Sequence, residues 1–185
     1  MKKLANHLRK HGEIAVIPTD TVYGVVARAV DAAAVARLYA LKSREGKPGT
    51  LVAANVDQLI ELGIDRHYLT RATEFWPGAV SLITPCGQNL FYIHHGVNSL
   101  AVRIPNDKNL LELLQQTGPL LTSSANQPGE PPATIVDEAK AYFGELVDWY
   151  EDGGYINAEP STVIKIVGNK IDVVRSGVVK FDESK

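Results

Sequence analysis

Apolar residues follow two spacings along this chain, and the change between them separates predicted helices from predicted strands. Apolar positions three and four residues apart are typical of a helix with one buried face, whereas short continuous or alternating runs are typical of strands. Helices are predicted at residues 4–10, 32–42, 57–63, 67–76 and 109–118, and from Thr134 onward. Strands are predicted at residues 13–18, 19–30, 50–55, 79–85, 99–105 and 119–126 and, as a hairpin, at 162–175.

Capping and turn residues define several of these boundaries. Asp31 precedes the helix at 32–42 and Thr134 precedes the last helix. Both side chains can accept hydrogen bonds from the free N–H groups of a first turn. Pro77-Gly78 ends the helix at 67–76. Gly168-Asn169 separates two strand-like runs, which predicts a hairpin.

The order of the elements predicts the fold class. Strands alternate with helices through the first two thirds of the chain, and strand-to-strand pairing follows at the end. Alternation of this kind is typical of α/β proteins, and a terminal hairpin adds antiparallel pairs to the sheet. Since no linker divides the chain, we predict a single α/β domain over residues 1–185, with a mixed parallel and antiparallel sheet.

Composition narrows the class of protein. Hydrophobic residues make up 45% and charged residues 22%, which is an ordinary globular composition. Cys86 is the single cysteine, which excludes an internal disulfide and a cysteine-cluster zinc site and suits a reducing compartment. The chain has neither an apolar run of the ~18 residues that a membrane helix needs nor a secretory signal. We therefore predict a soluble, cytoplasmic protein.

Charge bears on the choice of partner. With 19 Lys and Arg against 21 Asp and Glu, the net charge of −2 argues against a dedicated nucleic-acid binder. The cations are nevertheless grouped, since Arg37, Lys42, Arg44 and Lys47 lie close together with Glu45 as the only acid among them. Such a group is commonly a solvated helix end. The functional interpretation of this group of cations is a binding site for a small anion, because grouped cations focus the electric field on a ligand.

Several motifs for nucleotide and metal chemistry are missing. The chain has no phosphate-binding P-loop, no Gly-x-Gly-x-x-Gly dinucleotide motif, no His-Glu-x-x-His and no Gly-x-Ser-x-Gly. Side chains would therefore have to hold any nucleotide. His94-His95 is the only histidine pair, and neighbours on a strand point to opposite faces. We therefore predict no metal site made by the protein itself.

Polar segments stand where predicted strands or helices end, which is where α/β sheets place their sites. They are residues 17–24, 41–48, 121–129, and 159–164 with 173–177. Each also has a simple structural interpretation: a threonine turn bonding its own backbone, cations at a helix C-terminus, a plain Ser/Asn loop and a polar sheet edge. In the third segment, the small Ala125 would let a ligand approach the backbone.

Taken together, the segments contain a set of motifs in a fixed order. They are PTDTVYG, a helix ending in LKxR, WPG, LAVRIP, SAN followed by Gly-x-Pro-Pro and Thr, STVI and VRSG, from Glu13 to Gly177. In this order they resemble the threonylcarbamoyl-AMP synthase family of the YrdC/TsaC type, in its short, single-domain form. The resemblance implies a twisted mixed sheet flanked by helices, with a concave groove.

The resemblance also implies an activity and its partners. Proteins of this type condense L-threonine, bicarbonate and ATP to threonylcarbamoyl-AMP and pyrophosphate, and a partner complex then transfers the threonylcarbamoyl group to adenosine in tRNA. ATP is then a substrate accompanied by Mg²⁺, and tRNA is at most a weak direct contact. The family's catalytic and ATP-binding residues fall on Lys42, Arg44, Ser124 and Asn126. Arg175 would contact the nucleotide, and threonine would be held by Thr19 (or Thr21), Arg103 and Ser161.

The implied reaction makes an electrostatic demand. Threonine carboxylate, carbamate and triphosphate are all anions, and they would repel one another strongly in a site of low dielectric constant. The cations available to neutralise them are Lys42, Arg44, Arg103 and Arg175. Asp20 is the nearest acid, and we expect it to cap a turn, so no general base is assigned.

Two other functions remain as alternatives. The first is an RNA-binding module that uses the basic lip of the groove without ATP turnover, for which a steep salt dependence of RNA affinity would be the signature. The second is a regulator that binds a nucleotide or amino acid without catalysis. The complete set of Lys42, Arg44, Ser124 and Asn126 favours the enzyme over this second alternative.

Overall fold

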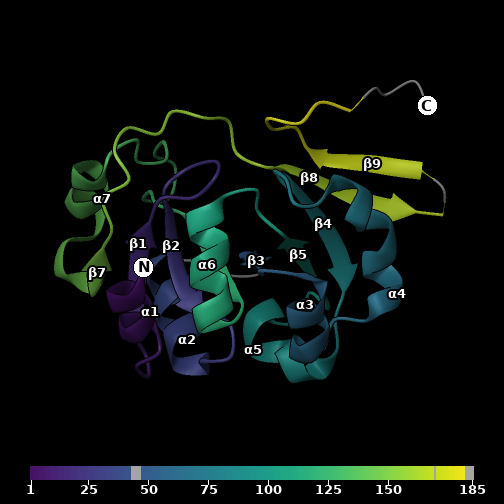
Figure 1. Ribbon diagram of the computed structural model, residues 1–185, viewed down its shortest axis with the longest axis horizontal. Coiled ribbons are helices and arrows are strands. Elements are labelled where there is room, and N and C mark those ends of the chain that lie inside the picture. The colour runs from purple at the N-terminus through teal and green to yellow at the C-terminus, as the bar shows by residue number, and fades with distance from the viewer. Residues whose placement is uncertain (43–46, 169, 182–185) are drawn as a thin grey trace.

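The computed structural model describes residues 1–42, 47–168 and 170–181. In this part of the chain, helices and strands alternate as predicted, and Figure 1 shows them around one central sheet. The helices are α1 (Lys2–Leu8), α2 (Ala32–Leu41), α3 (Val56–Leu62), α4 (Arg66–Leu69), α5 (Phe91–His94), α6 (Lys108–Thr117) and α7 (Val136–Phe143). Short 3-10 turns lie at Thr70–Phe75, Gln88–Leu90 and Gly144–Leu146.

The described strands form one nine-stranded sheet in the order β7-β1-β2-β6-β3-β5-β4-β8-β9. The strands are β1 (Ile14–Ile17), β2 (Gly24–Arg28), β3 (Thr50–Val52), β4 (Val80–Pro85), β5 (Ser99–Arg103), β6 (Leu120–Ser124), β7 (Trp149–Tyr150), β8 (Thr162–Val167) and β9 (Lys170–Arg175). The pairs β1–β7, β3–β5 and β4–β8 are parallel and the others are antiparallel. The predicted mixed α/β sheet is therefore confirmed.

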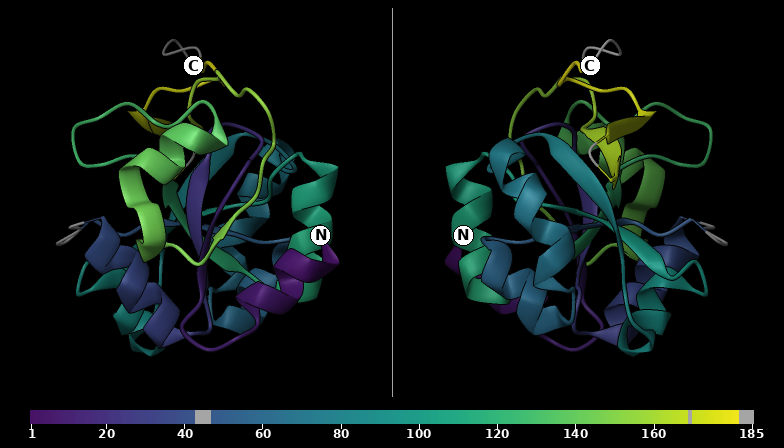
Figure 2. Two further views of the ribbon diagram at one scale, coloured as in Figure 1. Left: turned by 90° about the vertical axis from the view of Figure 1, so that its left-hand side faces the viewer. Right: turned by 90° about the vertical axis from the view of Figure 1, so that its right-hand side faces the viewer.

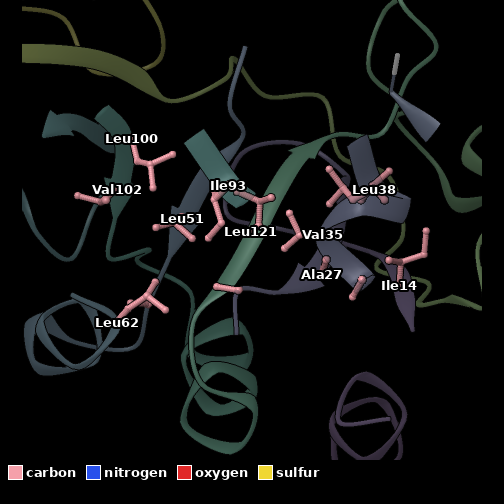
Figure 3. Close-up of a cluster of buried hydrophobic side chains, with 14 of the residues drawn as sticks. Ile14, Ala27, Val35, Leu38, Leu51, Leu62, Ile93, Leu100, Val102 and Leu121 are labelled. Carbon is pink, nitrogen blue, oxygen red and sulfur yellow. The ribbon is translucent and has the colours of Figure 1, made fainter. Parts of the chain in front are cut away.

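Two apolar layers cover the two faces of the sheet. Along β1, Ile14 and Val16 belong to one buried cluster, whereas Ala15 and Ile17 belong to the other. Alternate side chains of a strand point to opposite faces, so a strand buried on both sides is apolar throughout. Helices α1 and α6 pack on one face, and α2 and α5 lie together on the other (Figure 2). Figure 3 shows the second layer, where Val35 and Leu38 of α2 meet strand residues such as Leu121.

The predicted boundaries are confirmed at some places and wrong at others. Asp31 caps α2 by accepting hydrogen bonds from the N–H groups of Ala33 and Ala34 at 3.0 and 3.1 Å. Thr134 does not cap α7, because Ile135 occupies the N-cap. Instead, the Thr134 N–H and hydroxyl donate to Glu138 at 2.7 and 3.0 Å. The hairpin of β8 and β9 lies where it was predicted.

The histidine pair does not lie on a strand. His94 ends α5, and His95 follows it in the left-handed conformation, with φ of 47°. His94 is fully buried, and its Nδ1 accepts hydrogen bonds from the N–H groups of Gly96 and Asn98. His94 therefore holds the turn into β5. None of the helices in the described part of the chain has the length and apolar character needed to cross a membrane.

Candidate active site

A cavity of about 760 Å³ lies against the central strands. It is lined by residues of β3, β5 and β6, by the loop between β1 and β2, and by the hairpin of β8 and β9. Its volume falls within the range of ~300–1,000 Å³ that is usual for small-molecule sites. Segments far apart in the sequence therefore meet at this one cavity.

The lining of the cavity combines cationic, hydroxyl and apolar groups. Among the described lining residues, Lys47, Arg103 and Arg175 carry positive charge, and none is an acid. Hydroxyl groups come from the β1–β2 loop, β6 and Ser161, while Val97, Val163 and others supply apolar surface. Such a lining can bind an anion that also has an apolar portion.

Gly24 leaves room for threonine side chains that line the cavity. A Cβ atom on Gly24, the first residue of β2, would lie 2.6 Å from the Thr122 hydroxyl oxygen and 3.5 Å from a Thr19 methyl carbon. Any larger residue at position 24 would therefore displace hydroxyl side chains that line the cavity. The glycine of the PTDTVYG segment is thus needed for the shape of the site.

Arg103 lies at the end of β5 and is 3% exposed. Its Nη1 forms an ion pair with Asp20 Oδ1 at 2.8 Å, and Asp20 Oδ2 accepts a hydrogen bond from the Asn106 N–H at 3.2 Å. Asp20 is thus the counter-ion of Arg103 and does not cap its own turn. Burial lowers the pKa of the Arg103 guanidinium, and the adjacent carboxylate limits this shift. The buried Arg103 Nε makes no hydrogen bond within the described residues.

The β1–β2 loop is a threonine turn. Thr19 Oγ1 donates to Val22 O at 2.6 Å and accepts from the N–H groups of Thr21 and Val22, both at 3.2 Å. Thr19 and Thr21 also bond each other through their hydroxyl groups at 3.2 Å, and both line the cavity. The structural interpretation of this segment is therefore correct, because the Thr19 hydroxyl bonds the backbone of its own turn.

Lys42, Ser124 and Asn126 form one cluster, although they come from different elements. Lys42 Nζ donates to Ser124 O at 2.8 Å, to Asn126 Oδ1 at 2.9 Å and to the Asn126 backbone oxygen. The Ser124 hydroxyl donates to Asn126 Oδ1 at 2.7 Å. Ser124 lines the cavity, whereas Lys42 and Asn126 are not lining residues and are linked to the cavity through their hydrogen bonds with Ser124. Arg44 lies outside the described residues.

Ser161 and Arg175 also come together at the cavity. Arg175 Nη2 donates to Ser161 O at 2.7 Å and to Ser161 Oγ at 3.2 Å. Both residues line the cavity, one just before β8 and the other at the end of β9. The predicted hairpin is responsible for this contact, because it returns Arg175 to the start of β8.

Two residues singled out from the sequence play structural roles. Arg37 belongs to the basic group of residues 37–47, but it binds Asp148 through two contacts of 2.8 and 3.1 Å. Ala125 is fully buried, and its N–H donates to Tyr23 O at 2.8 Å. The expectation that a ligand approaches the backbone at Ala125 is therefore wrong. Conversely, Ser99 lines the cavity without having been singled out, while Thr122 lines it as a member of the predicted segment 121–129.

Among the described residues, one group of possible metal ligands brings together His7, Glu13 and Asp148. His7 Nε2 lies 3.1 Å from Glu13 Oε2. Burial works to raise the pKa of the Asp148 carboxyl, but hydrogen bonds from Arg37 and from the Ile14 N–H outweigh it and hold that pKa below its ordinary value. Because a guanidinium already neutralises Asp148, we assign no metal to this group.

Comparisons with known proteins agree with these features. A family model for the Sua5, YciO and YrdC proteins, described as telomere recombination, matches residues 7–177. A putative threonylcarbamoyl-AMP synthase of Mycobacterium leprae is 37% identical over 177 residues, covering 92% of this chain and 80% of the relative. The threonylcarbamoyl-AMP synthase of Chromohalobacter salexigens is 37% identical over 161 residues, covering 83% of this chain and 86% of the relative.

Solved structures show the same fold. P. abyssi Sua5 complexed with L-threonine aligns with a TM-score of 0.85 at 30% identity over 95% of this chain. This chain spans 53% of that protein's length. E. coli YciO aligns with a TM-score of 0.83 at 23% identity, covering 96% of this chain and 89% of that one, which supports the fold alone. From the family match, the identities and the shared fold, this chain belongs to the threonylcarbamoyl-AMP synthase family of the Sua5/YciO/YrdC type.

Proposed function

We propose that this protein is an L-threonylcarbamoyladenylate synthase, a nucleotidyltransferase that condenses L-threonine, bicarbonate and ATP to threonylcarbamoyl-AMP and pyrophosphate. The observation that carries the proposal is the cavity itself. Its described lining combines three cations with several hydroxyl groups and contains no acid, and the Lys42 cluster stands beside it. This is the environment that a reaction between several anions requires.

The amino acid is assigned to the end of the cavity at Arg103. The Arg103 guanidinium has an unused buried N–H at Nε, and a carboxylate is the group that such a donor binds most strongly. Thr19, with Thr21 beside it, and Ser161 supply hydroxyl groups for the rest of the amino acid. Sites that hydrogen-bond a substrate hydroxyl reject analogues that lack it, so these residues suit threonine.

The nucleotide is assigned to the remaining polar residues. Arg175 lines the cavity and is exposed, so its guanidinium is accessible to a nucleotide. Lys42, Ser124 and Asn126 are assigned to the phosphates, with Arg44 as the further member that the family resemblance implies. Mg²⁺ would arrive bound to the ATP phosphates, because the described lining offers hydroxyl groups and no carboxylate to hold it.

The proposed chemistry has two steps. The threonine ammonium group first loses a proton to solvent, and the resulting neutral amine attacks bicarbonate, which forms a carbamate and releases water. A carbamate oxygen then attacks the α-phosphorus of ATP, and the bond to the β-phosphate breaks so that pyrophosphate leaves. Both steps bring negative groups together, so catalysis depends on positioning and on fixed positive charge.

The product would pass to a complex that transfers the threonylcarbamoyl group to tRNA. We propose that residues 1–185 act as one domain in this reaction. A cytoplasmic location follows from the proposal, because ATP, bicarbonate and tRNA are all found in that compartment.

Pyrophosphate release tests the reaction class. The purified protein is incubated with MgATP, L-threonine and bicarbonate, and each of the last two is omitted in turn. We expect release only when all are present. Release without threonine would identify a plain ATPase and contradict the proposal, and so would RNA binding without any release.

Lys42→Ala tests the assigned phosphate site. Loss of a cation that stabilises developing charge costs about 2–4 kcal/mol of transition-state stabilisation, so kcat/KM falls by roughly 30- to 1,000-fold. Lys140→Ala is the matched control, because Lys140 is an exposed lysine whose partner is Asp137. Near-normal turnover by Lys42→Ala would show that Lys42 is not part of the phosphate site.

A further inference from the structure

We propose that Ser81, a buried serine that does not line the cavity, is a positioning residue for the amino-acid substrate. Its hydroxyl donates to Ser161 Oγ and thereby commits Ser161 to donate its own proton into the cavity. This proposal rests on the proposed function and extends it, since it states which hydrogen-bonding character the site presents to the substrate at Ser161.

The contacts of Ser161 define the network. Ser81 lies on β4 and is 0% exposed, and its Oγ is 3.0 Å from Ser161 Oγ. Arg175 Nη2 reaches the same Ser161 oxygen at 3.2 Å from β9. Ser161 is 7% exposed and lines the cavity. Its hydroxyl is therefore held by two side chains from two different strands.

The directions of these hydrogen bonds follow from the donors available. Arginine can only donate, so Ser161 Oγ accepts from Arg175. Within the described residues, Ser161 Oγ is the one hydrogen-bond partner of Ser81 Oγ. If Ser161 donated to Ser81, the Ser81 proton would be buried without an acceptor, which is unfavourable. Ser81 therefore donates, and both acceptor positions of Ser161 Oγ are filled.

It follows that the remaining proton of Ser161 is available to a ligand. A hydroxyl group offers one donor and two acceptor positions. Because Ser81 and Arg175 fill both acceptor positions, Ser161 can meet a ligand only as a donor. The ligand group at this point is then an oxygen acceptor of the amino acid, either its side-chain hydroxyl or its carboxylate.

The backbone around Ser161 is held equally firmly. The Thr162 N–H donates to Ala79 O, and the Val178 N–H donates to Pro160 O, both at 3.0 Å. A Cβ atom on Gly177 would lie 2.2 Å from Pro160 O and 2.6 Å from the Ser161 carbonyl carbon. Gly177 therefore packs directly against this backbone. The Ser161 hydroxyl is fixed in place before a ligand binds, which is what a specificity contact needs.

The experiment compares Ser81→Ala with Ser81→Cys and a control. The alanine removes the donor, and the cysteine keeps a similar size with a weak S–H donor. Thr84→Val is the matched control, because Thr84 is another fully buried hydroxyl on β4, makes no contact with Ser161 and does not line the cavity. L-Threonine binding is measured by calorimetry, and the KM values for threonine and ATP by pyrophosphate release.

We expect Ser81→Ala to weaken threonine binding and raise its KM by about two- to tenfold, which is the range expected for one hydrogen bond. The KM for ATP, kcat and the unfolding temperature should change little, Ser81→Cys should be intermediate and Thr84→Val unchanged. L-2-Aminobutyrate, which lacks the side-chain hydroxyl of threonine, distinguishes the two candidate acceptors, the hydroxyl and the carboxylate. If the acceptor is the hydroxyl, Ser81→Ala leaves binding of this analogue unchanged, and if it is the carboxylate, both amino acids bind more weakly.

Unchanged threonine affinity in a folded Ser81→Ala protein would overturn the proposal, as would an equal rise in the KM values for threonine and ATP. A different set of results would contradict the proposed function. If the unmodified protein binds threonine but releases no pyrophosphate, the proposed reaction is contradicted. The calorimetric comparison of Ser81→Ala with the unmodified protein still decides whether Ser81 positions Ser161 for threonine binding. If the unmodified protein binds no threonine, both proposals fall.

Discussion

Two of the aspartate–arginine pairs in the described residues, Arg37–Asp148 and Arg103–Asp20, have the same chemistry and opposite surroundings. Arg37 and Asp148 meet through two hydrogen bonds of 2.8 and 3.1 Å, and their side chains are 41% and 24% exposed. Arg103 and Asp20 make a single ion pair of 2.8 Å, and their side chains are 4% and 8% exposed. The first pair lies away from the cavity, whereas Arg103 lines it.

The two pairs also differ in whether the protein itself supplies acceptors for the N–H donors of the arginine. Arg37 also donates to Gly12 O and Leu146 O, so its guanidinium is used within the fold. Arg103 keeps a buried N–H at Nε without an acceptor in the described residues. A buried donor left unpaired is unfavourable, and a bound carboxylate would satisfy it. We therefore propose that the Arg103–Asp20 pair belongs to the binding site, whereas the Arg37–Asp148 pair belongs to the scaffold.

The largest effect is expected when the cavity pair is broken. Arg103→Gln leaves the Asp20 carboxylate buried without its counter-ion, which costs about 3–5 kcal/mol of folding free energy. Substrate binding through the guanidinium is lost in the same variant. Urea unfolding measures the first effect, and the KM for threonine measures the second.

The double variant Arg103→Gln with Asp20→Asn separates the two effects. It removes both charges, so most of the lost stability should return while threonine affinity stays at least ~100-fold reduced. Recovery of threonine binding in the double variant would show that Arg103 does not hold the substrate.

A smaller effect is expected at the other pair. Arg37→Met removes a half-exposed ion pair, whose contribution to the free energy of unfolding is about 1 kcal/mol or less. Its kcat and KM values should equal those of the unmodified protein, because Arg37 is remote from the cavity lining. A tenfold loss of kcat/KM in this variant would contradict the division between the two pairs.

The smallest effect is the pH dependence of that stability difference. The pKa of Asp148 is lowered in the folded protein. Its ionised form therefore contributes stability above its unfolded pKa of about 3.9, and this contribution is lost as the pH falls through the lower folded value. The difference in unfolding temperature between Arg37→Met and the unmodified protein should shrink from about pH 6 to about pH 3. A difference that stays constant or grows would be contrary to this origin.

Local patterns in the sequence were sufficient to predict most of the elements. Apolar alternation placed the strands, and Asp31 located the start of α2. The sequence pattern did not predict the four-residue helix Phe91–His94 or the two-residue strand Trp149–Tyr150, because neither is long enough to display a period. Thr134 was misjudged as a cap because its side chain found a partner in Glu138.

The polar segments at the ends of elements and the family resemblance predicted which residues gather at the cavity, but contacts between individual side chains were predictable only where local geometry creates them. The hairpin turn was sufficient to expect Arg175 near the start of β8. The contact between Ser81 and Ser161 depends on the parallel pairing of β4 with β8, which joins segments 80 residues apart. The partnership of Asp20 with Arg103 similarly depends on where the β1–β2 loop meets the end of β5. No local pattern encodes such pairings, so neither contact could be predicted from one sequence.

Mass spectrometry of the nucleotide product made with carbon-13 bicarbonate decides whether this protein joins threonine, bicarbonate and ATP. We expect a threonine-containing acyl-adenylate that carries the labelled carbon, formed by the unmodified protein and absent with the double variant at Arg103 and Asp20. An adenylate without the label, or a labelled adenylate formed equally well by the double variant, would contradict this expectation.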